Sequence, residues 1–164
     1  MKYFTGCLLL VFFFVESFSQ NYTRDAGLRI GNGFFASYRQ HYDEGKAVEG
    51  FAGFSKRGFR VIALKEYFKP VAVQRTSNMN LIYGFGIHAG VSYTNKFTYL
   101  HRVYYHDWKW TPQFGFDGIV GLEYAAPELP LIFSAAFQPY FEYSINRYFK
   151  VSPFNFIVAI KYRF

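Results

Sequence analysis

Apolar and polar residues alternate along most of the chain after its first twenty residues, and this period of two predicts β-strands with two different faces. No later stretch approaches the roughly 18 consecutive apolar residues that a transmembrane helix needs. The alternation is clearest in the C-terminal segment 155–164. There, one face carries Phe156, Val158, Ile160, Tyr162 and Phe164, and the other carries Ile157, Ala159, Lys161 and Arg163.

Small and polar residues gather on one face of the predicted strands. In segment 81–93, Gly84, Gly86 and Gly90 lie on one face and large apolar residues on the other. Glycine repeated along a face would leave a soluble core empty, whereas the narrow interior of a barrel needs room beside its larger side chains. The sequence therefore predicts an all-β chain folded as a single antiparallel up-and-down transmembrane β-barrel, with the apolar faces outside.

The barrel is expected to have about eight strands. A barrel whose N- and C-termini both lie in the periplasm needs an even number of strands, which favours counting the weakly alternating segment 97–105. Turns are expected at the periplasmic end at 55–58, 94–96 and 127–130, and outer loops at 41–46, 70–80, 106–113 and 144–153. The facing of Lys65 and Glu66 stays open. The predicted strands are 28–39, 48–54, 59–68, 81–93, 97–105, 114–124, 131–143 and 155–164.

The first nineteen residues have the features of a secretory signal peptide. Lys2 supplies the positive start, the apolar run 8–15 is too short to span a bilayer, and Ser17 and Ser19 are small residues at a cleavage site. An uncleaved membrane anchor is the alternative, which the short apolar run disfavours. We predict a signal peptide at 1–19 and one barrel domain at 20–164. Cys7 would leave with the signal, so the mature protein would contain no thiol or disulfide.

Charge narrows the range of partners. The chain has 18 Lys and Arg residues against 11 Asp and Glu residues, a formal net charge of +7. The basic residues are scattered and form no run, so an exported chain of this kind is not expected to bind nucleic acid.

Ionisable residues fall on the predicted inward faces. An isolated buried charge is very costly, so these groups are expected to pair in a polar network that fills the lumen. Eight strands leave an interior just wide enough for side chains. A continuous aqueous channel is the functional alternative. The predicted lumen network comprises Arg29, Glu49, His88, Asp117, Glu123, Glu142, Lys161 and Arg163.

No enzymatic activity, metal site or cofactor is predicted. His88 and Ser92 share a predicted strand face, and His101 and His106 lie near Asp107. None of these spacings is diagnostic of a nucleophile with its base or of a set of metal ligands.

Aromatic and basic residues mark the predicted outer loops, with Trp108, Trp110, Arg147 and Tyr148 as candidate contacts. Aromatic side chains near strand ends usually anchor a protein at the membrane interface, and a receptor or adhesin surface is the alternative. Basic residues beside them would meet the phosphates of lipopolysaccharide.

The C-terminal strand resembles the assembly signal of bacterial outer-membrane barrels, with Phe164 as the final aromatic and apolar residues at alternate positions before it. Residues 26–164 as a whole resemble the small eight-stranded barrels of the OmpA and OmpX type. The residue patterns of segments 116–124 and 161–164 are similar to those of small outer-membrane proteins of the Bacteroidota. The resemblance implies location in the bacterial outer membrane, insertion by the barrel assembly machinery, and contact with membrane lipids and lipopolysaccharide. The peptidoglycan-binding domain of OmpA has no counterpart, so a role in wall tethering is not implied.

Three functions remain open on this basis. The first is a structural or surface-interaction barrel with a sealed lumen. The second is a small porin-like pore. The third is a soluble exported barrel that binds a lipophilic ligand, which would need the apolar faces to point inward, and the charged, glycine-rich opposite faces disfavour it.

Overall fold

A computed structural model of the protein describes residues 23–55, 58–71, 78–99, 102–144 and 148–164. The predicted signal peptide at 1–19 lies outside the described residues. Within the ranges that are described, no helix has the length and apolar character needed to cross a membrane. The strands are β1 (Arg24–Ile30), β2 (Gly33–Asp43), β3 (Lys46–Ser55), β4 (Gly58–Pro70), β5 (Met79–Tyr99), β6 (Arg102–Ala125), β7 (Leu131–Phe137), β8 (Tyr140–Ser144), β9 (Tyr148–Ser152) and β10 (Phe156–Arg163).

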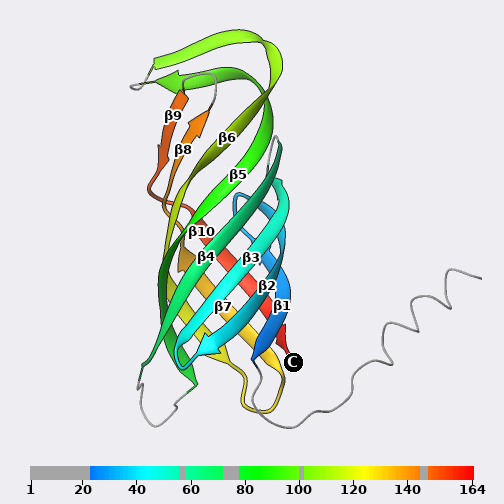
Figure 1. Cartoon of the computed structure of the whole chain (residues 1–164), viewed down its shortest axis with the longest axis vertical. Helices are drawn as coiled ribbons and strands as arrows, with labels where there is room; N and C mark the ends of the chain where they lie inside the picture. Colours follow the sequence, from blue (N-terminus) through cyan, green and yellow to red (C-terminus); the bar gives the residue numbers. More distant parts are fainter. Residues whose placement is uncertain (1–22, 56–57, 72–77, 100–101, 145–147) are drawn as a thin grey trace, which may run out of the picture.

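These segments form one closed, antiparallel up-and-down barrel of eight strands, which confirms the predicted all-β barrel and its strand number (Figure 1). β7 and β8 both pair with β6 in one continuous register, so together they make one barrel strand interrupted at Gln138 and Pro139. β9 and β10 make the last strand. Its interruption is a bulge, because Tyr140 pairs with Ser152 whereas Phe137 pairs with Phe156. Pairing of β1 with β10 closes the wall.

The two ends of the barrel differ. Arg24 and Phe164 lie together at one end, here called the terminus end, where a backbone hydrogen bond of 2.9 Å joins them. β5 and β6 extend past the other strands at the opposite end, here called the hairpin end (Figure 1). β4 begins at Gly58, which pairs with Ser92, so β5 continues beyond the edge of its neighbour. The hairpin end is therefore an extension of the β5–β6 side of the wall.

Two predicted strands were wrong, although their number was right. Segment 28–39 is divided between β1 and β2 by a short turn at Gly31 and Asn32. Ile30 and Phe34 both face outward, so the alternation continues in phase across the turn. For this reason the segment was predicted to be one strand, although Asn32-Gly33 is a sequence typical of hairpin turns. Segment 97–105 is not a separate strand but the meeting point of β5 and β6.

The predicted turn at 94–96 is also wrong, because β5 continues through it with a register shift between Thr94 and Lys96. Residues 106–108 of β6 stand opposite the single residue 95 of β5, and such additional residues are accommodated as a bulge. Segment 106–113 was predicted to be a loop and lies within β6, where even Pro112 has a partner, Val91.

The ends assigned to three connections were reversed. The 41–46 and 70–80 connections lie at the terminus end, and the 55–58 connection lies at the hairpin end. The unpredicted turn at Gly31 adds one strand before them, so each following strand of the N-terminal half runs in the direction opposite to the predicted one. The connection at 127–130 lies at the terminus end, as predicted. The loop predicted at 144–153 is wrong, because Tyr148–Ser152 within this segment is β9, which pairs with β8.

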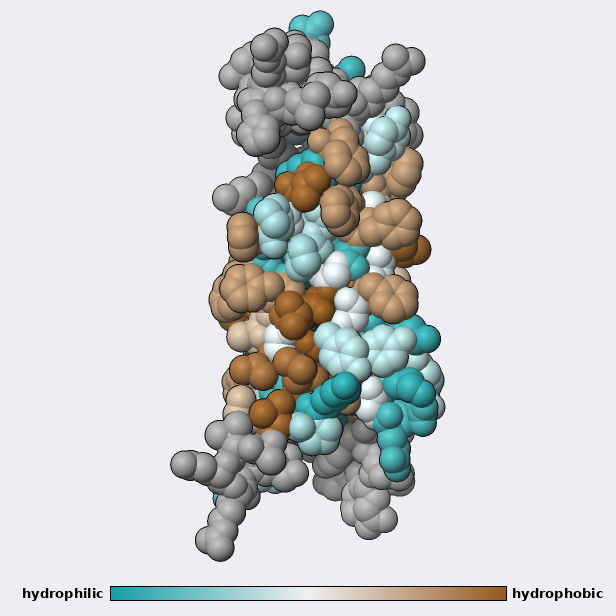
Figure 2. Space-filling view, turned by 90° about the vertical axis from the view of Figure 1, so that its left-hand side faces the viewer, coloured by the Kyte–Doolittle hydropathy of each residue, from teal (hydrophilic) through white to brown (hydrophobic). Residues whose placement is uncertain are grey.

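Side chains alternate between a largely apolar outer wall and a polar interior. The exposed outer positions include Phe34, Phe54, Phe85, Phe116 and Val120. Figure 2 shows one face of this wall, where brown apolar residues cover the left and centre and teal polar residues gather at the lower right. β4 settles the facing that the sequence left open: Glu66 is completely buried in the interior, and Lys65 is exposed on the outer wall.

Candidate functional site

Among the described residues, the interior near the terminus end holds seven fully buried ionisable residues from six strands, and the part-buried His41 lies 3.2 Å from one of them, Asp25. Asp25, Arg39 and Glu49 stand opposite one another on β1, β2 and β3. Inward positions of adjacent strands lie about 5 Å apart, so residues of opposite charge on such a row meet directly. All seven are at least 98% buried. This terminus-end cluster comprises Asp25, Glu49, Glu66 and Glu123 with Arg29, Arg39 and Lys161.

Arg39 is the centre of one half of the terminus-end cluster. Its Nε donates to Asp25 Oδ2 at 2.9 Å, and its Nη1 donates to Glu123 Oε2 at 2.7 Å and to Glu66 Oε2 at 3.3 Å. The same guanidinium lies 4.8 Å from the ring centre of Phe68. One arginine therefore joins carboxylates from β1, β4 and β6 across the lumen.

Glu49 is the centre of the other half. Arg29 binds it in a bidentate pair, with Nε at 2.9 Å and Nη2 at 2.5 Å, and Lys161 Nζ donates to it at 2.7 Å. Arg29 Nη2 also reaches Glu66 at 3.0 Å, which connects this half to Arg39. Bidentate, charge-assisted pairs of this kind are the strongest polar contacts in proteins, so they fix four strands against one another.

A second polar group, the hairpin-end cluster, lies farther along the lumen. His88 Nδ1 is 2.6 Å from Asp117 Oδ2, and Gln138 Nε2 donates to the other oxygen of Asp117 at 2.9 Å. Arg60 pairs with Glu142. The hairpin-end cluster consists of Arg60, His88, Asp117, Gln138, Tyr140 and Glu142.

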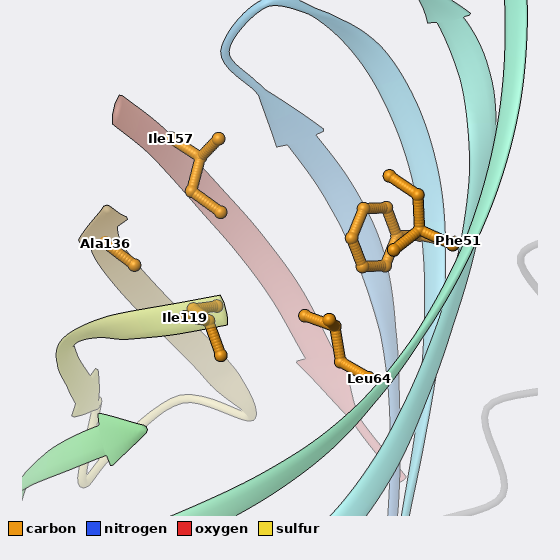
Figure 3. Close-up of a cluster of buried hydrophobic side chains, with 6 residues drawn as sticks. Phe51, Leu64, Ile119, Ala136 and Ile157 are labelled. Atoms are coloured by element: carbon orange, nitrogen blue, oxygen red, sulfur yellow. The ribbon is translucent and has the colours of Figure 1, made fainter. Parts of the chain in front are cut away.

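An apolar layer separates the two clusters. Along β4, the inward order from the terminus end is Glu66, Leu64, Ile62 and Arg60, so two aliphatic residues stand between the charged groups. β6 repeats this order with Ile119 between Glu123 and Asp117. Figure 3 shows these side chains pointing inward from strands on several sides of the barrel. The layer consists of Phe51, Ile62, Leu64, Ile119, Ala136 and Ile157.

One small cavity lies in the lumen beside the apolar layer. It has a volume of about 20 Å³, touches Arg29, Arg60 and Gln138 and is bounded by Phe51, Ile62 and Ile157 of the apolar layer. A volume of this size holds about one water molecule. This cavity, which reaches residues of both clusters, therefore has room for a single water and not for a column of water.

Seven of the eight residues predicted for the lumen lie in these two clusters, and Arg163 is half-buried at the end of β10. Sequence reasoning left out Asp25, Arg39, Arg60 and Glu66. Asp25 lies before the predicted start of the first strand. Arg60 and Glu66 lie on the same face of β4, so fixing the face of one would have placed both.

The other predicted residues are placed as follows. Trp108 and Trp110 lie in β6 rather than in a loop, and both are exposed beside Tyr93, at ring distances of 5.1 and 5.2 Å. Arg147 and His101 lie outside the described residues, and Tyr148 is the first residue of β9. The residues of the predicted C-terminal signal all face outward along β10 and at its end: Phe156, Val158, Ile160, Tyr162 and Phe164.

His88 and Ser92 do not form a catalytic pair, because His88 binds Asp117 and the Ser92 hydroxyl donates to Gln113 at 3.1 Å. In the described ranges, no group of three or more His, Cys, Asp or Glu residues is arranged to hold a metal ion.

No protein-family model, curated protein or solved structure matches the chain.

Proposed function

We propose that this chain is an integral outer-membrane β-barrel of the small OmpA and OmpX type, sealed inside, with a structural or surface-interaction role at its hairpin end. The observation that carries the proposal is that charged side chains are buried inside the barrel and large apolar side chains are exposed on its outer wall, the opposite of a soluble protein. Arg39, Glu49 and Glu66 are completely buried, whereas Phe34, Phe85 and Phe116 are more than 60% exposed. A soluble protein rarely exposes so continuous an apolar surface, and a barrel in lipid requires it.

The height of the apolar wall supports a membrane location. On β5, the outward positions between Tyr83 and Tyr93 are all apolar, at residues 85, 87, 89 and 91. Ten residues of strand cover about 33 Å, and a strand tilt of 35–45° reduces this to about 25 Å along the barrel axis, the height of the apolar band in outer-membrane barrels.

Aromatic residues with polar groups border this band at both ends. Tyr42, Tyr124 and Tyr162 lie toward the terminus end, and Tyr93, Trp108 and Trp110 lie toward the hairpin end. Such girdles occupy the two membrane–water interfaces of a spanning barrel. With the termini in the periplasm, the hairpin end would meet lipopolysaccharide and surface partners, and the barrel assembly machinery would insert the chain.

The filled interior favours a sealed barrel over the two alternatives. A pore would need a water path through the apolar layer, and a lipophile carrier would need an apolar cavity. The lumen instead holds two clusters of bonded ionic groups on either side of Ile62, Leu64 and Ile119.

The membrane location predicts that the mature protein is recovered in the outer-membrane fraction of the producing cell. A folded barrel resists unfolding by detergent at room temperature, so the unheated band should migrate differently from the boiled band on an electrophoresis gel. A soluble periplasmic band without this shift would contradict the proposal and favour the lipophile carrier.

The sealed lumen predicts that the wild-type protein gives no steady single-channel conductance in planar bilayers, because the apolar layer excludes a continuous column of water. The heat shift of the same preparation verifies insertion, and a porin in the same bilayer is the positive control. Stable open steps from the inserted protein would instead favour the pore.

A further inference from the structure

Two lysines face outward on β4 near the terminus end. Lys65 and Lys69 are exposed, with Tyr67 between them on the same face. Lys65 Nζ lies 5.8 Å from the ring centre of Tyr67, and Lys69 Nζ lies 5.6 Å from that of Tyr83. The two rings stack on each other at 5.4 Å. Cations over aromatic rings are attracted by the ring face, so both ammonium groups are held on one tyrosine platform.

The described residues of β4 and β5 place no carboxylate on the outer wall beside the two lysines, and the β2–β3 turn, which bonds to Phe68 through Gly45, carries Asp43 and Glu44. Glu66 is the only acidic residue of β4 and is buried in the lumen, and β5 contains no acidic residue. Asp43, at the nearby β2–β3 turn, binds Lys46 at 2.5 Å, and this hydrogen bond lowers the pKa of Asp43. The platform is therefore a cationic surface at the border of the apolar band.

An apolar recess of about 360 Å³ opens on the outer wall over β6, β7 and β10. It exists because Ala135 is small and stands between its larger partners Leu122 on β6 and Val158 on β10. Three lining residues, Glu123, Ser134 and Ala159, alternate with the outward ones and direct their side chains toward the interior. The outward side chains are those of Met79, Leu122, Tyr124, Phe133, Ala135 and Val158.

The platform and the recess are connected by strand pairing. Neighbouring strands lie about 4.8 Å apart, so the four steps from Lys69 to Val158 cover about 19 Å. Half of the roughly 30 Å hydrocarbon core, about 15 Å, is the depth available to one acyl chain. Because the strands are tilted, the row also rises from the terminus end toward the middle of the wall. The paired residues in this row are Lys69, Leu81, Leu122, Ala135 and Val158.

We propose that the platform and the recess form one binding site for an anionic glycerophospholipid in the leaflet at the terminus end. The lipid phosphate would accept hydrogen bonds from the ammonium groups of Lys65 and Lys69, and one acyl chain would fill the recess above Ala135. The two lysines attract the phosphate, and the apolar row that leads from Lys69 to the recess accommodates an acyl chain. A phospholipid would use both features, whereas a free anion would use only the first. This inference rests on the proposed membrane location.

The test uses the full mature protein, folded into phosphatidylcholine vesicles that contain phosphatidylglycerol and then extracted for native mass spectrometry. The wild type should retain phosphatidylglycerol in preference to phosphatidylcholine. Lys65→Gln with Lys69→Gln should lower this retention by roughly thirtyfold, the scale expected for two lysines at an anionic surface. Ala135→Phe should lower it separately by filling the recess. Arg24→Gln with Lys109→Gln removes the same charge from exposed positions elsewhere and should leave retention unchanged.

The heat shift, measured before extraction, separates the two proposals. A wild type that does not insert would refute the membrane location. A wild type that inserts but retains both lipids equally would overturn only the lipid site, as would an equal loss in the control pair. Displacement of the lipid by excess inorganic phosphate, or full retention in Ala135→Phe, would overturn it too, because the platform would then bind a phosphate ion without the chain.

Discussion

Arg39→Met is expected to lower the free energy of unfolding by about 3–5 kcal/mol, the cost of removing one partner from a buried ionic network. Arg39 binds Asp25, Glu66 and Glu123, and methionine would fill much of its volume without a charge. Four buried carboxylates would then share Arg29 and Lys161, with His41 beside Asp25. Denaturant unfolding of the protein in lipid vesicles, followed by tryptophan fluorescence, measures the loss.

Two variants show whether the unpaired charge is the cause. Adding Glu123→Gln to Arg39→Met removes one of the stranded carboxylates and should recover part of the lost stability. Arg24→Met changes an exposed arginine at the terminus end and should stay within about 0.5 kcal/mol of the wild type. A loss below about 1 kcal/mol in Arg39→Met would mean that water reaches these carboxylates, contrary to a sealed lumen.

The facing of side chains on most strands could be predicted from the sequence because apolar and polar residues alternate with a period of two, whereas Lys65 and Glu66 of β4, charged on both faces, gave no such pattern. Glu49, Asp117 and Lys161 alternate with apolar neighbours, and each one is buried. Turn positions were less predictable, because the three residues 31–33 separate the paired Ile30 and Phe34, and an odd number of connecting residues keeps the alternation in phase. Thr94 to Lys96 has turn-like residues, yet β6 supplies partners on both sides of the bulge, so β5 continues.

The partners within the lumen could not be derived from the sequence, because they depend on register across the barrel. Arg39 and Glu123 are 84 positions apart in the chain and meet at 2.7 Å only because the wall closes. The apolar layer is similar. Ile62 and Ile119 alternate within their own strands like any inward residue, and only the stagger of neighbouring strands sets them at one level with Ile157.

Val120→Arg is expected to make folding into bilayers less favourable by about 2 kcal/mol, because Val120 lies inside the apolar band, between the interface, where a basic residue costs about 0–1 kcal/mol, and the midplane, where it costs about 2–4 kcal/mol. Val120 faces outward on β6, 48% exposed, and pairs with Tyr83 and Phe137 on the apolar wall. Folding titrations in vesicles measure this cost, with Val120→Leu as the matched apolar control.

The depth of the substituted residue and the face on which it lies make the test specific to a membrane-facing wall. Tyr42→Arg, at the terminus-end girdle, should cost only about 0–1 kcal/mol, because its charge reaches the interface. Gly121→Arg should fail for a different reason: Gly121 faces the lumen against Ala136, so arginine would overfill the interior and prevent folding in detergent micelles as well. A soluble barrel would tolerate Val120→Arg and Tyr42→Arg equally and gain solubility from both. Equal folding of these two variants would therefore mean that the exposed apolar wall does not face lipid.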